Sequence, residues 1–116
     1  MYRGVLDQGA VEFTGYLEIE REAIVTALIG PDGLVSAAGE GDEVEVVLDV
    51  TPFYAEGGGQ QADWGRLSVN APGREAELTV VDVQQPLPGL IAHRVTVLSG
   101  EVRPGDAVLA RVDVNR

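Results

Sequence analysis

Short segments with β-strand character, separated by turn signals, run along the whole chain and constrain its fold more than any other feature. Residues 75–83 alternate charged or polar with apolar side chains, as a strand with one solvated face does. Turn signals such as Pro31-Asp32-Gly33 and Arg103-Pro104-Gly105-Asp106 separate further strand-like segments. These segments are residues 22–29, 34–35, 43–48, 66–69, 91–98 and 107–114. About seven short strands predict an all-β fold, a small closed or partly closed β-barrel, and not alternating strands and helices.

The length of 116 residues suits one domain with one core. No segment after about residue 11 favours a helix, so residues 1–12 are expected to be a frayed lead-in segment and residues 13–116 the barrel domain. Within the domain, Pro86-Leu87-Pro88-Gly89 is expected to end the strand that covers residues 75–83.

Residue usage excludes several classes of site. The chain has no cysteine and one histidine, so it can form no disulfide, and a zinc site would lack ligands; no metal site is expected.

No apolar stretch approaches the roughly 20 residues that span a bilayer, so no membrane association is expected. The start, Met1-Tyr2-Arg3-Gly4, does not lead into a secretory signal, and the expected location is the cytoplasm.

The charge balance bears on nucleic-acid partners. The formal net charge is −11, and every basic residue is an arginine. Such a surface repels phosphate backbones, so DNA is not an expected partner. Any contact with RNA would need most of its attraction from outside this chain. The acidic residues are otherwise interpreted as solubilising side chains on strand faces and loops.

Residues 51–65, the glycine-rich segment, are too distinctive for a generic hairpin loop. Gly57, Gly58 and Gly59 allow positive φ angles and leave room for an approaching ligand or chain. Half of the chain's aromatic residues lie in the same segment, where they can anchor its ends or offer a stacking face. They are Phe53, Tyr54 and Trp64. The alternative interpretation is a long structural loop with buried aromatic anchors.

The run Thr51-Pro52-Phe53-Tyr54-Ala55-Glu56-Gly57-Gly58-Gly59-Gln60, followed by Asp63 and Gly65, resembles the glycine-rich signature of the alanyl-tRNA synthetase family and its free-standing editing relatives. Phe13-Thr14-Gly15-Tyr16 and the segment 105–113 also resemble that family, so the resemblance covers residues 13–116. Gly57 and Ala62 depart from the usual synthetase residues, which are serine and glycine. In this family the domain is a barrel that resembles the second domain of translation elongation factors.

The resemblance implies a module that precedes a zinc-dependent editing domain in a longer protein. That editing domain carries an H-x-x-x-H and a C-x-x-x-H motif, and neither is found in this chain. We therefore expect no catalytic residue and no complete active site here, with zinc and ATP implied for the parent protein only. The implied partners are tRNA(Ala) and the adjoining editing domain. The residues implied to support the editing site and the tRNA acceptor end are Thr51, Tyr54, Glu56, Gly57, Gly58, Gly59, Gln60 and Asp63.

Other interpretations stay open at this point. The parent could be a full synthetase or a free-standing editing protein that acts on mischarged tRNA(Ala), and the barrel could instead serve protein interactions only. Gly58-Gly59-Gln60 also occurs in release factors that hydrolyse peptidyl-tRNA, but those proteins surround it with basic residues, which this segment lacks. Glu56 is expected to be structural and not a general base. His93 is expected to be an ordinary strand residue.

Overall fold

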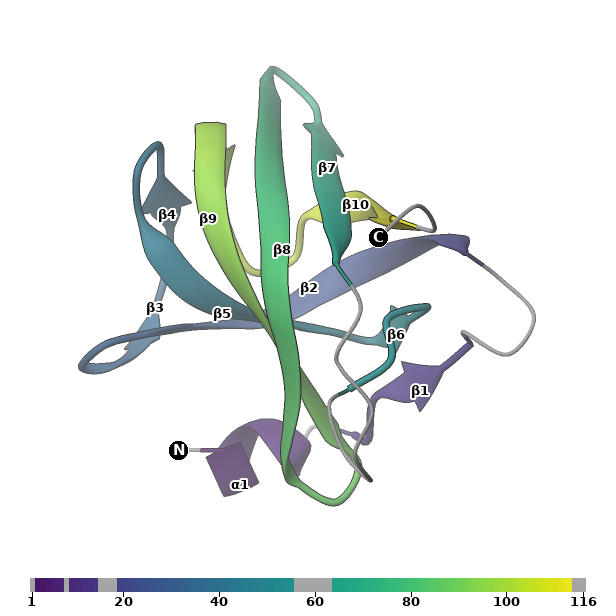
Figure 1. The fold of residues 1–116 in the computed structure, drawn as a ribbon. Helices are drawn as coiled ribbons and strands as arrows, with labels where there is room; N and C mark the ends of the chain where they lie inside the picture. Colours follow the sequence, from purple (N-terminus) through teal and green to yellow (C-terminus); the bar gives the residue numbers. More distant parts are fainter. Residues whose placement is uncertain (1, 8, 15–18, 56–63, 114–116) are drawn as a thin grey trace.

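The computed structural model describes residues 2–7, 9–14, 19–55 and 64–113, and within them six antiparallel strands close into a barrel (Figure 1). The order of neighbours is β10, β7, β8, β9, β5 and β2, and β10 pairs again with β2 to complete the ring. Their bounds are β2 (Glu20–Gly30), β5 (Glu43–Leu48), β7 (Gly65–Ala71), β8 (Arg74–Leu87), β9 (Leu90–Val102) and β10 (Ala107–Val112). The all-β barrel predicted from the sequence is confirmed.

Strand β2 makes closure possible because its two halves serve different neighbours. Its first half pairs with β10, from Glu20 opposite Arg111 to Ile24 opposite Ala107. Its second half pairs with β5, with a register shift between Val25 and Ala27. Such an irregularity bends a strand and increases its twist, which lets one strand complete a small ring.

Three shorter pairings lie at the margin of the barrel. β3 (Gly33–Val35) forms the predicted hairpin with the end of β2. β4 (Ala38–Gly39) pairs with the end of β9. β1 (Glu12–Phe13) and β6 (Val50–Thr51) form a separate parallel pair at the start of the glycine-rich segment. The sequence predicted the first of these pairings and not the other two.

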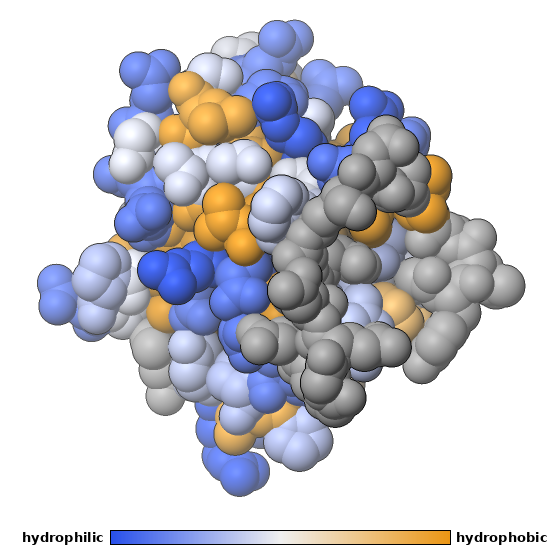
Figure 2. Space-filling view, viewed as in Figure 1, coloured by the Kyte–Doolittle hydropathy of each residue, from blue (hydrophilic) through white to orange (hydrophobic). Residues whose placement is uncertain are grey.

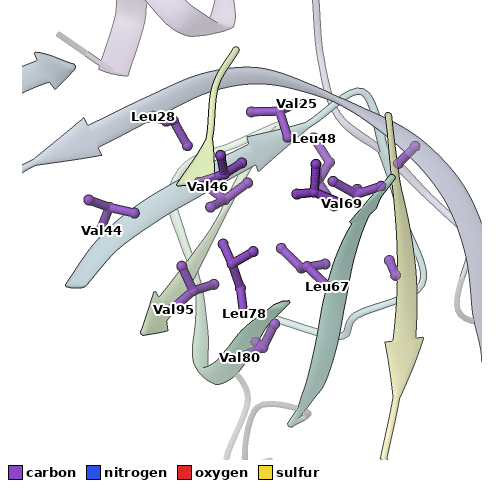
Figure 3. Close-up of a cluster of buried hydrophobic side chains, with 14 of the residues drawn as sticks. Val25, Leu28, Val44, Val46, Leu48, Leu67, Val69, Leu78, Val80 and Val95 are labelled. Atoms are coloured by element: carbon purple, nitrogen blue, oxygen red, sulfur yellow. The ribbon is translucent and has the colours of Figure 1, made fainter. Parts of the chain in front are cut away.

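The barrel is filled by branched aliphatic side chains from all six strands (Figure 3). Leu28, Val46, Leu67 and Leu78 are fully buried there. Along each strand, these inward-facing side chains alternate with side chains that point out of the barrel. This is the period-two pattern that the sequence showed. This interior also contains a polar side chain, His93, whose exposed fraction is 0%.

A second apolar cluster lies outside the barrel and explains why β2 and β5 carry continuous apolar runs. Ala27, Ile29 and Val47 point away from the barrel interior and pack with Val5 of α1 (Tyr2–Leu6). Strands covered on both faces need apolar residues at successive positions. Figure 1 shows α1 beside the turn that joins β8 to β9, and the hydroxyl of Tyr2 donates a 2.6 Å hydrogen bond to Glu45.

The expectation of a frayed lead-in over residues 1–12 is therefore wrong for the described part of that stretch. Val5 is only 2% exposed, and Val11 N–H donates to the carbonyl of Gly89. The apolar outer face of β2 and β5 gives the first turn of helix a surface to pack on, which local propensity does not reveal. No helix among the described residues is long and apolar enough to cross a membrane.

Strand β8 also runs further than expected, through Pro86 to Leu87. The register with β9 shifts between Gln84 and Leu87, so Pro86 falls where no ladder partner is required. Proline is tolerated at such a break in the ladder, because it has no N–H to donate to a neighbouring strand. The turn at Gly89, whose φ is +86°, then reverses the chain into β9.

A bidentate ion pair joins the start of β8 to the turn before β10. The guanidinium of Arg74 donates to both carboxylate oxygens of Asp106, at 2.6 and 2.7 Å, and to the carbonyl of Glu101. Arg103 N–H also donates to Asp106, at 2.8 Å. These donors, with the Arg74 hydrogen bonds first, hold the pKa of Asp106 below its ordinary value against the opposing effect of its burial.

Replacing Asp106 with asparagine is expected to lower the melting temperature at pH 7 by several degrees, because Arg74 loses its bidentate partner at a nearly buried position. A depressed carboxyl pKa adds stability above the pKa of the unfolded chain and loses it as pH falls through the folded pKa. The difference between the variant and the unsubstituted chain should therefore shrink in acid. Glu20→Gln is the control, since Glu20 forms an exposed pair with Arg111. Equal melting of Asp106→Asn and the unsubstituted chain at pH 7 would contradict this interpretation.

Candidate functional site: the ends of the glycine-rich segment

The structure describes both ends of the glycine-rich segment. Residues 51–55 leave strand β6, and Trp64 and Gly65 enter β7. Of the predicted site residues, Thr51 and Tyr54 lie in these ends. Six others fall outside the described residues, so their predicted roles stay untested: Glu56, Gly57, Gly58, Gly59, Gln60 and Asp63.

A buried hydrogen-bond chain holds the first end. The Nδ1 atom of His93 lies 2.8 Å from the carbonyl oxygen of Val46, and Nε2 lies 2.7 Å from Oγ1 of Thr51. Oγ1 of Thr51 in turn accepts a hydrogen bond from Phe53 N–H at 3.0 Å. Thr51, Phe53 and His93 are all fully buried.

The chemistry of these partners decides where each proton lies. A carbonyl oxygen only accepts, so Nδ1 of His93 must carry the ring proton. Burial lowers the pKa of His93 from 6.5 to about 4, and the hydrogen bond to Val46 opposes this shift only in part. The ring is neutral at pH 7, so Nε2 is an acceptor and the hydroxyl of Thr51 donates to it. Both ring nitrogens are occupied inside the barrel, which leaves neither for general base catalysis or metal binding.

Phe53 connects the two ends of the segment. Its ring packs edge-on against His93, with 5.4 Å between ring centroids and an interplanar angle of 75°. On another side it lies against Gly65, where an added Cβ would be 2.7 Å from Cε1 of Phe53 and 2.0 Å from the carbonyl oxygen of Arg111. Gly65 is thus the residue type that allows Phe53, the start of β7 and β10 to approach this closely.

Tyr54 and the parallel pair of β1 and β6 brace the same end from outside. Thr14 donates through its N–H to the carbonyl of Thr51 at 2.8 Å, which extends the pairing of the two strands by one residue. The half-buried ring of Tyr54 packs edge-on against Phe13, with 6.2 Å between centroids. The interpretation of buried aromatic anchors is therefore correct for Phe53 and applies in part to Tyr54.

Trp64, at the second end, is 46% exposed and borders an open groove of about 800 Å³. Asp113 N–H donates to the carbonyl of Trp64 at 2.8 Å and ties this end to the residue after β10. Ile19 and Val81 are exposed apolar side chains on the same groove, and Arg66 and Arg111 line it too. Each of these arginines faces an acidic partner: Arg66 pairs with Glu77, and Arg111 pairs with Glu20.

The face shown in Figure 2 is not a single apolar surface over its described residues. Figure 2 shows apolar patches separated by polar and charged side chains on the side formed by β7, β8 and β9. In the part of the chain that the structure describes, no group of three or more His, Asp or Glu side chains could hold a metal ion. The described geometry thus anchors the two ends of a segment and borders a groove.

His93 is the residue whose role the sequence interpretation missed. It does lie on a strand, but it faces the barrel interior and bonds to Thr51, which is 42 residues away in the sequence. The alternation of side chains along the strand could have revealed this role. His93 shares its strand face with Ile91, Val95 and Val97, all of which are buried core residues. A polar side chain in phase with core residues needs buried partners.

Comparison with known proteins agrees with the resemblance noted in the sequence. Residues 5–116 match the family described as tRNA synthetases class II (A). The alanine–tRNA ligase of Salinispora tropica is 53% identical over 116 residues, which is 99% of this chain and 13% of that protein. The corresponding ligase of Frankia alni is 54% identical over 110 residues, or 93% of this chain and 12% of that protein. That of Acidothermus cellulolyticus is 58% identical over 106 residues, or 91% of this chain and 12% of that protein.

These matches run through nearly the whole barrel, including the glycine-rich segment and its two anchored ends. The chain spans between 12% and 13% of the length of these relatives. Its fold, its glycine-rich segment and its similarity along almost every residue lead to one assignment: the chain belongs to the alanyl-tRNA synthetase family.

Proposed function

We propose that this chain is the β-barrel module of an alanine–tRNA ligase, where it helps to position the acceptor end of tRNA(Ala) beside an adjoining editing domain. The observation that carries the proposal is the pair of ends at Thr51 and Gly65, both of which are fixed to the barrel by contacts with its interior. A rigid element that presents a segment of small residues suits the close approach of another backbone or of a ribose.

In this proposal the chain contributes shape and hydrogen bonds, and the parent supplies the reactions. ATP serves amino-acid activation in the parent, and zinc serves hydrolysis of mischarged tRNA(Ala) in its editing domain. The proposed location of the parent protein is the cytoplasm. The residues proposed to support the editing site remain Thr51, Tyr54, Glu56, Gly57, Gly58, Gly59, Gln60 and Asp63.

The net charge of −11 shapes how the module would meet RNA. Arg66 and Arg111 border the groove beside Trp64, but both lie next to carboxylates, so they add little net attraction for phosphate. We therefore assign the long-range attraction for tRNA to other parts of the parent, and to this chain the local positioning of the acceptor end.

A free-standing editing protein is the second candidate parent. The ligases that match this chain at 53% to 58% identity favour the synthetase. A barrel that serves protein interactions only is the other alternative, and it predicts that substitutions in the glycine-rich segment leave hydrolysis of mischarged tRNA unchanged.

Replacing Gln60 with alanine in the longer protein that contains this chain tests the proposal. The amide of Gln60 can both donate to and accept from a ribose or an aminoacyl group. Its loss is expected to slow Ser-tRNA(Ala) deacylation by about 5- to 30-fold, the equivalent of roughly 1–2 kcal/mol, with the melting temperature unchanged. Aminoacylation with alanine should stay at the unsubstituted rate.

Asn70→Ala is the matched control. It also deletes a side-chain amide, but Asn70 is exposed and lies near the end of β7, whereas Gly65 is at its start. Its deacylation rate should equal that of the unsubstituted protein. If folded Gln60→Ala and Asn70→Ala proteins both deacylate at the unsubstituted rate, the case for this residue in editing is lost and the interaction-only alternative gains.

A further inference from the structure

We infer that His93 is the positioning residue of the glycine-rich segment, setting both of its ends through Thr51 and Phe53. The inference concerns described residues only, and its consequence for hydrolysis rests on the proposed function. It is based on a series of contacts that begins at His93 in the barrel core, passes through Thr51 and Phe53, and ends at Gly65, next to Trp64.

The chain of contacts begins with a polar group that the core must satisfy. Burying an imidazole without partners is unfavourable, and an apolar residue of similar volume would fill the same space without that requirement. His93 instead has two partners, Val46 and Thr51, one on each ring nitrogen. Because the carbonyl of Val46 fixes the ring proton on Nδ1, only a donor can satisfy Nε2, and the hydroxyl of Thr51 is that donor.

The second step acts where strand pairing stops. The carbonyl of Thr51 still accepts from Thr14, as part of the pairing of β1 and β6. Two residues later, Phe53 N–H bonds to the side chain of Thr51 instead of to a neighbouring strand. A threonine hydroxyl that bonds to the backbone two residues on is a recognised way to turn a chain. His93 orients this hydroxyl by accepting a hydrogen bond from it, so the exit direction of the segment depends on the imidazole.

The third step reaches the other end. The ring of Phe53 packs against both the ring of His93 and Gly65. Gly65 follows Trp64, whose carbonyl accepts from Asp113. A shift of Phe53 therefore displaces the start of β7 or the contact around Trp64, since closely packed groups leave no gap to absorb it.

Thr51→Val and Thr51→Ser form the test pair. Valine keeps the shape of threonine and removes the hydroxyl, whereas serine keeps the hydroxyl and removes a methyl group. Trp64 is the only tryptophan in the chain, so its fluorescence reports the second end directly. Measured on the 116-residue chain well below its melting temperature, Thr51→Val is expected to show red-shifted emission and stronger acrylamide quenching, while Thr51→Ser keeps the unsubstituted spectrum.

A second pair of variants replaces His93 itself, and it tests the same role if Thr51→Val does not fold. Glutamine can place its amide oxygen near the position of Nε2, and asparagine can place its amide only near the position of Nδ1. His93→Gln is therefore expected to keep the Trp64 spectrum, and His93→Asn to shift it as Thr51→Val does. If the folded Thr51→Val and His93→Asn chains both keep the unsubstituted spectrum, the positioning role is wrong.

Deacylation separates this inference from the proposed function. In the longer protein, Thr51→Val is expected to slow Ser-tRNA(Ala) deacylation about tenfold, and Thr51→Ser, which keeps the hydroxyl, is expected to slow it less. A shifted Trp64 spectrum with unchanged deacylation would uphold the positioning role and overturn the editing role of the segment. An unshifted spectrum overturns the positioning role whatever the deacylation rate.

Discussion

Gly65→Ala is expected to lower the free energy of unfolding by about 3 kcal/mol or more, because the new methyl group has no space. Its Cβ would lie 2.0 Å from the carbonyl oxygen of Arg111 and under 3 Å from two ring atoms of Phe53. The carbonyl belongs to β10, whose Val112 is the register partner of Gly65, so it cannot move without disturbing the barrel closure. Gly65 has no positive φ, so the loss is steric and does not arise from backbone strain.

Gly39→Ala is the control for Gly65→Ala, since Gly39 also lies on a strand without a positive φ. The nearest atom to its added Cβ is the carbonyl oxygen of Gly100 at 3.9 Å, an ordinary contact distance. Urea unfolding followed by far-ultraviolet circular dichroism should show a much lower midpoint for Gly65→Ala and little change for Gly39→Ala. Equal midpoints for the two variants would show that β7 and β10 are less closely packed at this point.

Acidification is expected to destabilise the fold through His93 by about 2 kcal/mol between pH 7 and pH 5, and by about 3 kcal/mol once the folded pKa near 4 is reached. The sign follows from proton binding. In the unfolded chain the imidazole gains a proton as pH falls through its ordinary pKa of 6.5, whereas in the folded chain it stays neutral until about pH 4. Protons therefore bind preferentially to the unfolded state in this range, and stability rises with pH across it.

His93→Gln separates this effect from the titration of carboxylates such as Asp106. The variant keeps a polar group at the position and has no imidazole to protonate. Urea unfolding at pH 5, 6 and 7 should show a stability that depends on pH in the unsubstituted chain and much less so in His93→Gln. If both proteins lose the same free energy over this range, then the imidazole of His93 is not buried in the neutral form.

The two predictions concern two neighbours of Phe53, Gly65 and His93. Gly65 leaves the space that the ring of Phe53 occupies. His93 orients the hydroxyl of Thr51, which accepts the hydrogen bond from Phe53 N–H and so fixes the backbone at Phe53. The glycine-rich segment is therefore held by steric fit at one end and by directed polar contacts at the other. Both are properties of the barrel interior, which links the stability of the fold to the geometry of the candidate site.

Local sequence determined the strands and turns of this protein. Side-chain alternation and branched residues predicted the segment 43–48, which is β5 with the same bounds. Pro104 and Gly105 predicted a turn, and Gly105 has a φ of +94° with the hydrogen bond from Asp106 N–H to the carbonyl of Arg103. The run from Thr51 to Gly65 indicated the family, because its residue types follow a long ungapped pattern that local structure alone does not require.

Tertiary structure alone decided which residues meet. The closure of β10 on β2, the ion pair of Arg74 with Asp106 and the bond between Thr51 and His93 each join residues far apart in the chain. Periodicity predicts which face a side chain occupies, but the partner on that face depends on register shifts and twist summed over all six strands. For the same reason the sequence could place His93 on a strand, and only the closed barrel shows that its neutral ring holds the start of the glycine-rich segment.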